Sequence, residues 1–263
     1  MIAQIRRSSS ATSSGARRSA KRVEAFTDSA GLSSLADGVF KVALPRDIVE
    51  GLHFLWRHQI LRTFAVMVGG SNFASSATMA VLVLYAVGPG SAMRLSTQVF
   101  GVLLAMFAVG SLVGSFVAGR VERALGRRRS IAACFLTGVL SIGLPAVTAD
   151  PWAIGAAFAL GGAGTIISNI IMVSLRQRIT PDRLLGRVNS GYRLVAWGSM
   201  PLGAAAGGLL AQAFGLRAVF AVMAVVALAL LAGMTVVTDD RLDAAERDAD
   251  VAAAADAQPL ENT

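Results

Sequence analysis

Two short sets of polar residues stand out because each lies inside a long apolar stretch. Within each set the spacing is i, i+3, i+4 and i+7, which places the side chains on one face of an α-helix. The sets are Asn72, Ser75, Ser76 and Met79, and Thr165, Ser168, Asn169 and Met172. Polar side chains facing lipid are unfavourable, so both sets are predicted to face protein or water. Either they line a path for a solute or they form hydrogen bonds between helices, because the same geometry serves both.

Arg193 is a third candidate, with Tyr192 and Trp197 beside it near the start of another apolar stretch. An arginine just inside a membrane commonly extends its charged end to the interface, and the alternative is that it binds an anionic group. We therefore add Tyr192, Arg193 and Trp197 to the candidate residues of a solute path.

The residues that enzymes need for most chemistry are scarce. His53 and His58 are the two histidines and Cys134 is the one cysteine. The apolar stretches hold no histidine to bind a metal or haem or to activate a serine. The sequence also lacks the glycine-rich phosphate-binding loop of ATP-binding proteins. We expect no enzyme activity, no metal and no cofactor.

Composition indicates a membrane protein. The 263 residues are 54% hydrophobic and 15% charged, whereas soluble domains are about 45–50% apolar and about 25% charged. The net charge of +8 does not indicate nucleic-acid binding, because the arginines stand between apolar runs, where orientation signals belong.

Six stretches approach or exceed the ~20 residues that a helix needs to cross a bilayer. They are Leu61–Val87, Val99–Gly119, Ser130–Thr148, Trp152–Leu175, Ser190–Phe214 and Leu216–Val237. Helix is predicted for all of them, because backbone polar groups in lipid must be satisfied within the segment. The fold class is therefore all-α and integral to the membrane. Closely spaced glycines are expected to allow close helix packing. They are Gly110, Gly114, Gly119, Gly161, Gly162, Gly164, Gly203, Gly207 and Gly208.

Arginines fill every second gap between these stretches. Those after the second and fourth stretches are Arg120, Arg123, Arg127, Arg128, Arg129, Arg176, Arg178, Arg183 and Arg187, whereas the alternate gaps hold only Arg94 and Arg217. Positive charge favours the cytoplasmic side. We expect a multi-pass protein of the cell membrane with both termini in the cytoplasm and with Ser174–Arg193 as a cytoplasmic loop.

The remaining segments flank the six-helix region, residues 61–238. Residues 1–30 are basic and are predicted to be disordered, with an organellar transit peptide as the alternative. Residues 31–45 form a short mixed run. Residues 46–60 are predicted to form an amphipathic helix on the membrane surface, with Trp56 at headgroup level. Residues 239–263 are acidic and are expected to be a solvated tail.

Three stretches resemble the second, six-helix half of the major facilitator superfamily, in the branch that contains siderophore and macrolide exporters. They are Glu50–His58, Gly119–Arg128 and Ser174–Arg193. The second is similar to the family's Gly-x-x-x-Asp-Arg-x-Gly-Arg-Arg loop, although Arg123 and Ala124 depart from that pattern. The resemblance implies a cytoplasmic gating loop, whose candidates are Gly119, Gly126, Arg127, Arg128, Arg176, Arg178 and Arg187.

Residues 29–45 are similar to the start of the family's first helix, where Asp37 is the candidate proton-coupling acid. The chain then passes directly to the central segment, so we expect that most of helix one and all of helices two to six are missing, through an internal deletion or a faulty gene model. The resemblance implies proton-linked efflux of a small lipophilic or siderophore-like solute by proton antiport. For one half alone, either two copies pair as a homodimer, or the missing N-terminal half comes from another chain, or the product does not transport. The alternative function is a membrane scaffold or assembly partner without transport.

Overall fold

The structure, a computed structural model, describes the backbone of residues 44–257 and the side chains of residues 49–251. The chain divides into residues 1–49 and residues 50–263, and the described part lies almost wholly in the second unit. The predicted disordered segment 1–30, Asp37 with most of the run 31–45, and the end of the acidic tail all lie outside the described residues.

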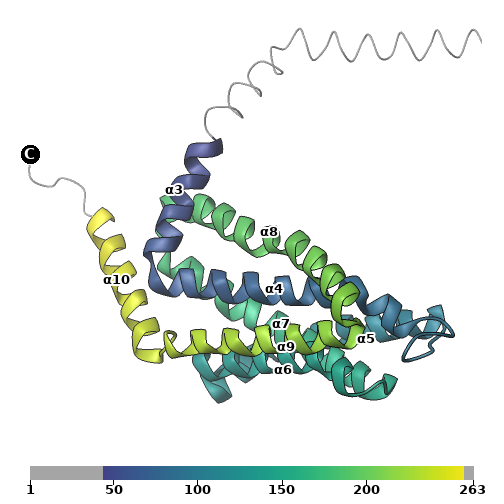
Figure 1. Ribbon diagram of the computed structural model, residues 1–263. Coiled ribbons are helices and arrows are strands. Elements are labelled where there is room, and N and C mark those ends of the chain that lie inside the picture. Colours follow the sequence, from purple (N-terminus) through teal and green to yellow (C-terminus); the bar gives the residue numbers. More distant parts are fainter. Residues whose placement is uncertain (1–43, 258–263) are drawn as a thin grey trace, which may run out of the picture. The chain divides into compact units, whose positions relative to one another are not determined.

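Six long helices form the main part of the second unit. Figure 1 shows them packed side by side. They are α4 (Gln59–Ala86), α5 (Thr97–Leu125), α6 (Arg127–Val147), α7 (Pro151–Ile179), α8 (Asp182–Phe214) and α9 (Leu216–Leu230), which continues as the 3₁₀ turn η1 (Leu231–Thr235). All 6 are long and apolar enough to cross a membrane. The flanking helices are α3 (Leu44–Arg57) and α10 (Asp239–Ala257). The described part contains no β-sheet, so the all-α prediction is confirmed.

The prediction that Ser174–Arg193 forms a long loop is wrong. α7 continues to Ile179 and α8 begins at Asp182, so only Thr180 and Pro181 separate them. Likewise, Gly126 alone joins α5 to α6, with a positive φ of 78° that glycine adopts without steric cost. The arginines, leucines and glutamine of these segments favour helix. The helices therefore extend beyond the ~20 residues that a bilayer requires.

The buried side chains form two clusters. One gathers side chains from the start of α4 and α6 and the end of α7 with α10, through Leu61, Ile131, Leu175 and Leu242. We call this the arginine-rich end, because the helix junctions at Gly126 and Pro181 belong to it. The other cluster joins the opposite ends of the same helices, through Tyr85, Ile142, Ile154 and Phe220. Successive helices therefore alternate in direction.

Glycines set the closest approaches between helices. A Cβ at Gly203 or Gly207 of α8 would overlap the carbonyl oxygen of Phe73 or Ala77 on α4. A Cβ at Gly110 of α5 would overlap the carbonyl oxygen of Ala159 on α7. Because these neighbours are backbone atoms, even alanine would force the helices apart. The pairs α4 with α8 and α5 with α7 are therefore packed backbone to backbone, as the spacing of these three glycines predicted. The prediction fails at Gly119 and Gly208, where a Cβ would meet no atom within 4 Å.

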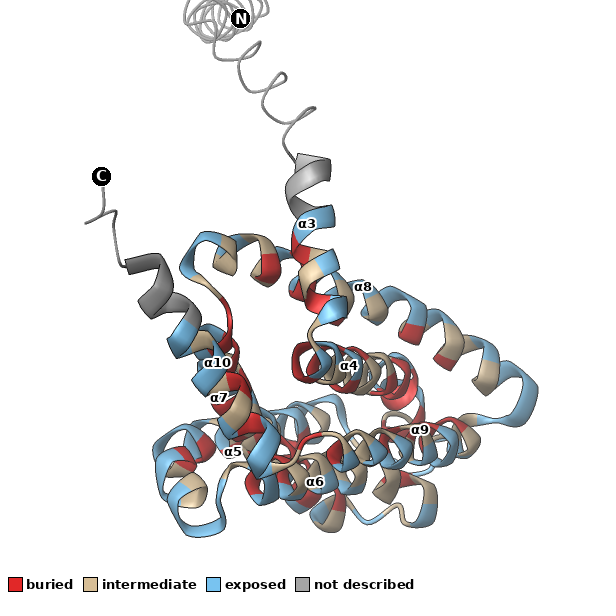
Figure 2. Cartoon of the chain, turned by 90° about the vertical axis from the view of Figure 1, so that its left-hand side faces the viewer, coloured by how far each residue is buried: buried red, intermediate tan, exposed pale blue. Residues whose placement is uncertain are grey.

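The two flanking helices pack on protein. α3 is amphipathic, as predicted, but its inner face contacts α8, where Gly51 meets the backbone of Arg187 and Leu55 is fully buried. Trp56, which was expected at headgroup level, is 41% exposed. The acidic segment also differs from the solvated tail that we expected. It forms α10, and Figure 2 shows buried positions along this helix. Its Leu242 is fully buried and its Ala245 is 9% exposed. These two side chains lie three residues apart on one helical face, which packs against the arginine-rich end.

Candidate functional site

Two adjoining cavities lie among the spanning helices. The first, of about 360 Å³, is lined by residues of α4, α6, α7 and α8. The second, of about 270 Å³, is lined by residues of α4, α5, α6, α7 and α9. Ser71, Asn72 and Thr165 line both cavities. The two cavities therefore form one groove, which we call the polar groove.

Eight of the nine predicted solute-path residues line this groove. Those on the first cavity are Asn72, Thr165, Ser168, Asn169, Tyr192, Arg193 and Trp197. Ser75 lines the second, and Asn72 and Thr165 line it as well. Ser76 lines neither cavity. The groove therefore brings together polar residues of α4, α7 and α8 that are far apart in the chain.

The hydrogen bonds of these residues are of two kinds, one between helices and the others within a single helix. The Asn72 amide donates to the Ala196 carbonyl of α8 at 2.6 Å, which is a bond between helices. Thr165 and Ser168 instead donate to carbonyls of their own helix, those of Gly161 and Gly164, both at 2.8 Å. Their hydroxyl oxygens keep acceptor capacity for a solute or water. Asn72 thus both fixes α4 to α8 and lines the groove.

Arg176 lies in the first cavity, although we had assigned it to a gating loop. Its side chain is 7% exposed. The guanidinium stacks over the Tyr192 ring at 4.0 Å and donates to Asn189 Oδ1 at 3.1 Å. Arg193 lines the same cavity and stacks over Trp197 at 4.3 Å.

Sequence reasoning missed Asn189 and the place of Arg176, although a signal was present. Arg176 continues the α7 set at one further helical turn beyond Met172. Asn189, Tyr192, Arg193 and Ala196 again have the spacing i, i+3, i+4 and i+7, and all four line the first cavity.

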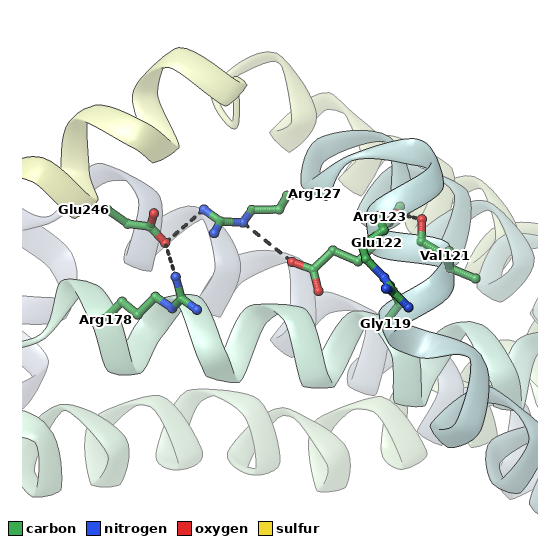
Figure 3. Close-up of polar contacts among 8 residues, drawn as sticks. Gly119, Val121, Glu122, Arg123, Arg127, Arg178 and Glu246 are labelled. Atoms are coloured by element: carbon green, nitrogen blue, oxygen red, sulfur yellow. Dashed lines mark hydrogen bonds and ion pairs between the residues drawn. The ribbon is translucent and has the colours of Figure 1, made fainter.

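Three of the gating-loop candidates, Arg127, Arg178 and Arg187, form ion pairs at the arginine-rich end, and Figure 3 shows those of Arg127 and Arg178. Arg127 pairs with Glu246 of α10 at 2.9 Å and with Glu122 at 3.6 Å. Arg178 approaches the same Glu246 oxygen at 3.8 Å. Arg187 pairs with Glu50 of α3 at 2.5 Å. Two helix ends therefore share one acid of α10.

The other gating-loop candidates do not join this cluster. Arg128 donates to the Met234 carbonyl at 3.4 Å. Gly119 and Gly126 have open space where a Cβ would stand. Glu246, which ties α10 to the bundle, was missed because the acidic tail was taken to be solvated.

His58 stands beside this cluster, between α3 and α4. Burial lowers the pKa of His58, and the charge of Asp248 on α10 acts in the opposite direction. Its Nδ1 is buried and has no hydrogen-bond partner among the residues that the structure describes. Over the same residues, no group of three His, Cys, Asp or Glu side chains is placed to hold a metal ion.

Comparisons with known proteins agree with this architecture. The family model described as Major Facilitator Superfamily matches residues 29–259. An uncharacterised MFS-type transporter of Sinorhizobium fredii, y4rN, is 29% identical over 201 residues, which are 71% of this chain and 47% of the relative. Another, YfkF of Bacillus subtilis, is 29% identical over 147 residues, or 55% of this chain and 36% of the relative. The matched part thus spans less than half the length of either curated relative.

Proposed function

Because the chain belongs to the Major Facilitator Superfamily, we propose that it supplies one wall of a membrane path for the efflux of small molecules. The family places it among multi-pass membrane transporters and not among enzymes. The observation that carries the proposal is the polar groove. It is the place where polar side chains of four spanning helices converge inside an otherwise apolar bundle.

Membrane physics favours a path over simple packing. Polar groups within a bilayer are retained where they face protein or a water-filled cavity. Hydrogen bonding between helices accounts for Asn72 but not for Thr165, Ser168 or Asn169. Asn169 is exposed and lines the first cavity. These three side chains leave polar groups directed at the groove.

A complete path needs a second wall. Transporters of this type move two repeats against each other around a site at the membrane midplane. A second copy of this chain or a separate N-terminal half would supply the facing wall. The acid proposed for proton antiport is Asp37, which lies outside the described residues, and the lining of both cavities contains no aspartate or glutamate.

The proposal includes an orientation and a solute. The arginine-rich end faces the cytoplasm of the cell membrane and both termini lie there, supported by the arginine distribution. The solute is small and lipophilic or siderophore-like. Apolar lining residues such as Phe135, Ile166 and Met200 support a lipophilic solute, and the resemblance of Ser174–Arg193 to the exporter branch supports efflux.

A second function is a membrane scaffold or assembly partner that does not transport. Packing favours it, because the Asn72 bond to α8 and the glycine approaches of α8 to α4 hold helices together without a solute. The two functions differ in one measurable property, which is net movement of a solute across a sealed membrane.

Proteoliposomes test this difference. The full chain is purified, reconstituted and given a lipophilic fluorescent dye under a proton gradient. We expect gradient-dependent dye movement that collapses with a protonophore. In a Cys134→Ala background, Ser75→Cys labelled with a thiol reagent is expected to block movement. The matched control, Ser76→Cys, lies outside both cavities and is expected to remain active. Absence of dye movement under every gradient would favour the scaffold.

A further inference from the structure

The charged residues that line the first cavity are all positive. Its lining includes two arginines, Arg176 and Arg193, and no aspartate or glutamate. The second cavity has no charged lining residue at all. The polar groove is therefore positive toward the arginine-rich end and neutral beyond it.

Arg176 differs in its partners from three other arginines of that end. Arg127, Arg178 and Arg187 each pair with a carboxylate. The partners that the structure shows for Arg176 are neutral, namely the Asn189 amide oxygen and the Tyr192 ring. Arg176 is nevertheless more than nine-tenths buried, with 7% of its surface exposed.

A buried cation without an acid is unfavourable, because its desolvation is not offset by an opposite charge. Neutral acceptors and an aromatic ring recover part of that cost. A guanidinium has five N–H donors in a planar fork suited to a carboxylate or phosphate, and Asn189 accepts one of them. Among the residues that the structure describes, Arg176 has no carboxylate partner, and an anion would supply the opposite charge.

We propose that the first cavity binds one anionic group, a carboxylate or phosphate, carried by a molecule with an apolar body. Arg176 is the charge partner, and Arg193 on the Trp197 ring provides a second positive group on the same cavity. The apolar body lies against Phe135, Ile166 and Met172 and extends toward the neutral second cavity. This inference rests on the proposed transport function, for which it names the solute class.

An anionic group of this kind can come from a solute or from the headgroup of an acidic lipid. Equilibrium binding to the full chain in neutral detergent separates charge recognition from transport. The probes are radiolabelled 2-naphthoate and its neutral counterpart 2-naphthamide, which share one ring system. We expect naphthoate to bind about tenfold more tightly or better, because charge-assisted hydrogen bonds of this size are lost with the amide.

Three variants assign the effect to Arg176. Arg176→Gln is expected to reduce naphthoate affinity to that of naphthamide. Asn189→Asp keeps the arginine and adds an internal carboxylate at the position that now accepts from it at 3.1 Å, so it should abolish the preference without removing a side chain. Arg183→Gln, an exposed arginine outside the cavity, is the matched control and should bind as the wild type does. Size-exclusion profiles of the three variants serve as the control for folding.

Competition with short-chain phosphatidylglycerol and phosphatidylcholine distinguishes the two sources. Displacement of naphthoate by phosphatidylglycerol alone assigns the site to an acidic lipid, and absence of displacement assigns it to a solute. Equal affinity for naphthoate and naphthamide, or an unchanged preference in folded Arg176→Gln and Asn189→Asp, would overturn the inference. Naphthoate preference in a protein that moves no dye would keep the anion site and reject transport, whereas dye movement without the preference would do the reverse.

Discussion

Both ends of the bundle have a buried apolar cluster, but they differ in their charged contacts. At the opposite end, Tyr85 is 1% exposed, packs edge-on against Phe220 at 5.0 Å and donates to the Thr148 carbonyl at 3.1 Å. The charged contact there is a helix cap, in which Asp150 accepts from Trp152 and Ala153 at 3.3 and 3.2 Å. At the arginine-rich end, ion pairs link different helices, as Glu246 does for Arg127 and Arg178.

Both ends are held by buried apolar clusters, and ion pairs between helices are an addition at the arginine-rich end. Aromatic and aliphatic packing is lost only when the helices separate. Ion pairs respond to salt and pH and exchange partners at little cost. Arg176 lines the first cavity, so the end with ion pairs between helices is also the end where the cavity lining carries charge.

The largest expected effect is at the opposite end. Tyr85→Ala removes a fully packed ring and should cost about 3–5 kcal/mol, as such truncations do in buried sites. The measurement is thermal unfolding of the purified protein in detergent. Tyr85→Phe, which removes only the hydrogen bond to Thr148, should cost about 1 kcal/mol. Equal stability of Tyr85→Ala and wild type would show that this end is not held by its aromatic cluster.

A smaller and more local effect is expected from the ion pairs of the arginine-rich end. Glu246→Gln should loosen α10 and increase its proteolytic cleavage in low salt, with the difference shrinking as salt is added. The matched variant is Glu50→Gln, whose pair with Arg187 is more exposed, at 52% and 41% of the side chains against 19% and 28% for Glu246 and Arg127. It should change cleavage less, since exposed pairs contribute little. A larger increase in cleavage for Glu50→Gln than for Glu246→Gln would contradict the assignment of Glu246 as the more stabilising of the two ion-pair acids.

The smallest expected effect concerns pH. Burial lowers the pKa of His58 below its ordinary value of about 6.5. The unfolded chain therefore binds more protons than the folded one as the pH falls below that value, and stability falls with it. Wild type should lose stability between pH 7.5 and 5.5 relative to His58→Asn in thermal unfolding. Asp248 opposes the shift, so Asp248→Asn should enlarge the loss. A stability gain on acidification relative to His58→Asn would contradict this sign.

Most of the fold could be predicted from the sequence because lipid imposes simple rules. The six spans follow from length and apolarity, and the structure moves their ends by up to eight residues, the largest shift being the start of α8 at Asp182 instead of Ser190. The glycine approaches, such as Gly207 against Ala77, followed from spacing. The loop Ser174–Arg193 was predicted wrongly, since a polar helix end and a polar loop have the same hydropathy and differ only in backbone hydrogen bonding.

The site was predicted in its residue types and only partly in its grouping. Helical spacing found Asn72 and Thr165 but could not show that α4 and α7 share a groove. Arg176 was placed with the gating residues because it is close in sequence to Arg178. Two residues are about 200° apart around a helix, so Arg176 lies on the face that lines the first cavity and Arg178 lies on the face near Glu246. The docking of α10 was not predicted, because Leu242 is the one large aliphatic side chain among the charged residues and alanines at the start of this segment.

The most direct test of the account is which side of the membrane each end faces. In a Cys134→Ala background, Gly186→Cys at the arginine-rich end and Gly90→Cys at the opposite end both have open space for a side chain. Intact cells are treated with a membrane-impermeant thiol reagent before and after permeabilisation. We predict that Gly90→Cys is labelled in intact cells and Gly186→Cys only after permeabilisation. Labelling of Gly186→Cys in intact cells, with protection of Gly90→Cys, would contradict the orientation and the assignment of the arginine-rich end to the cytoplasm.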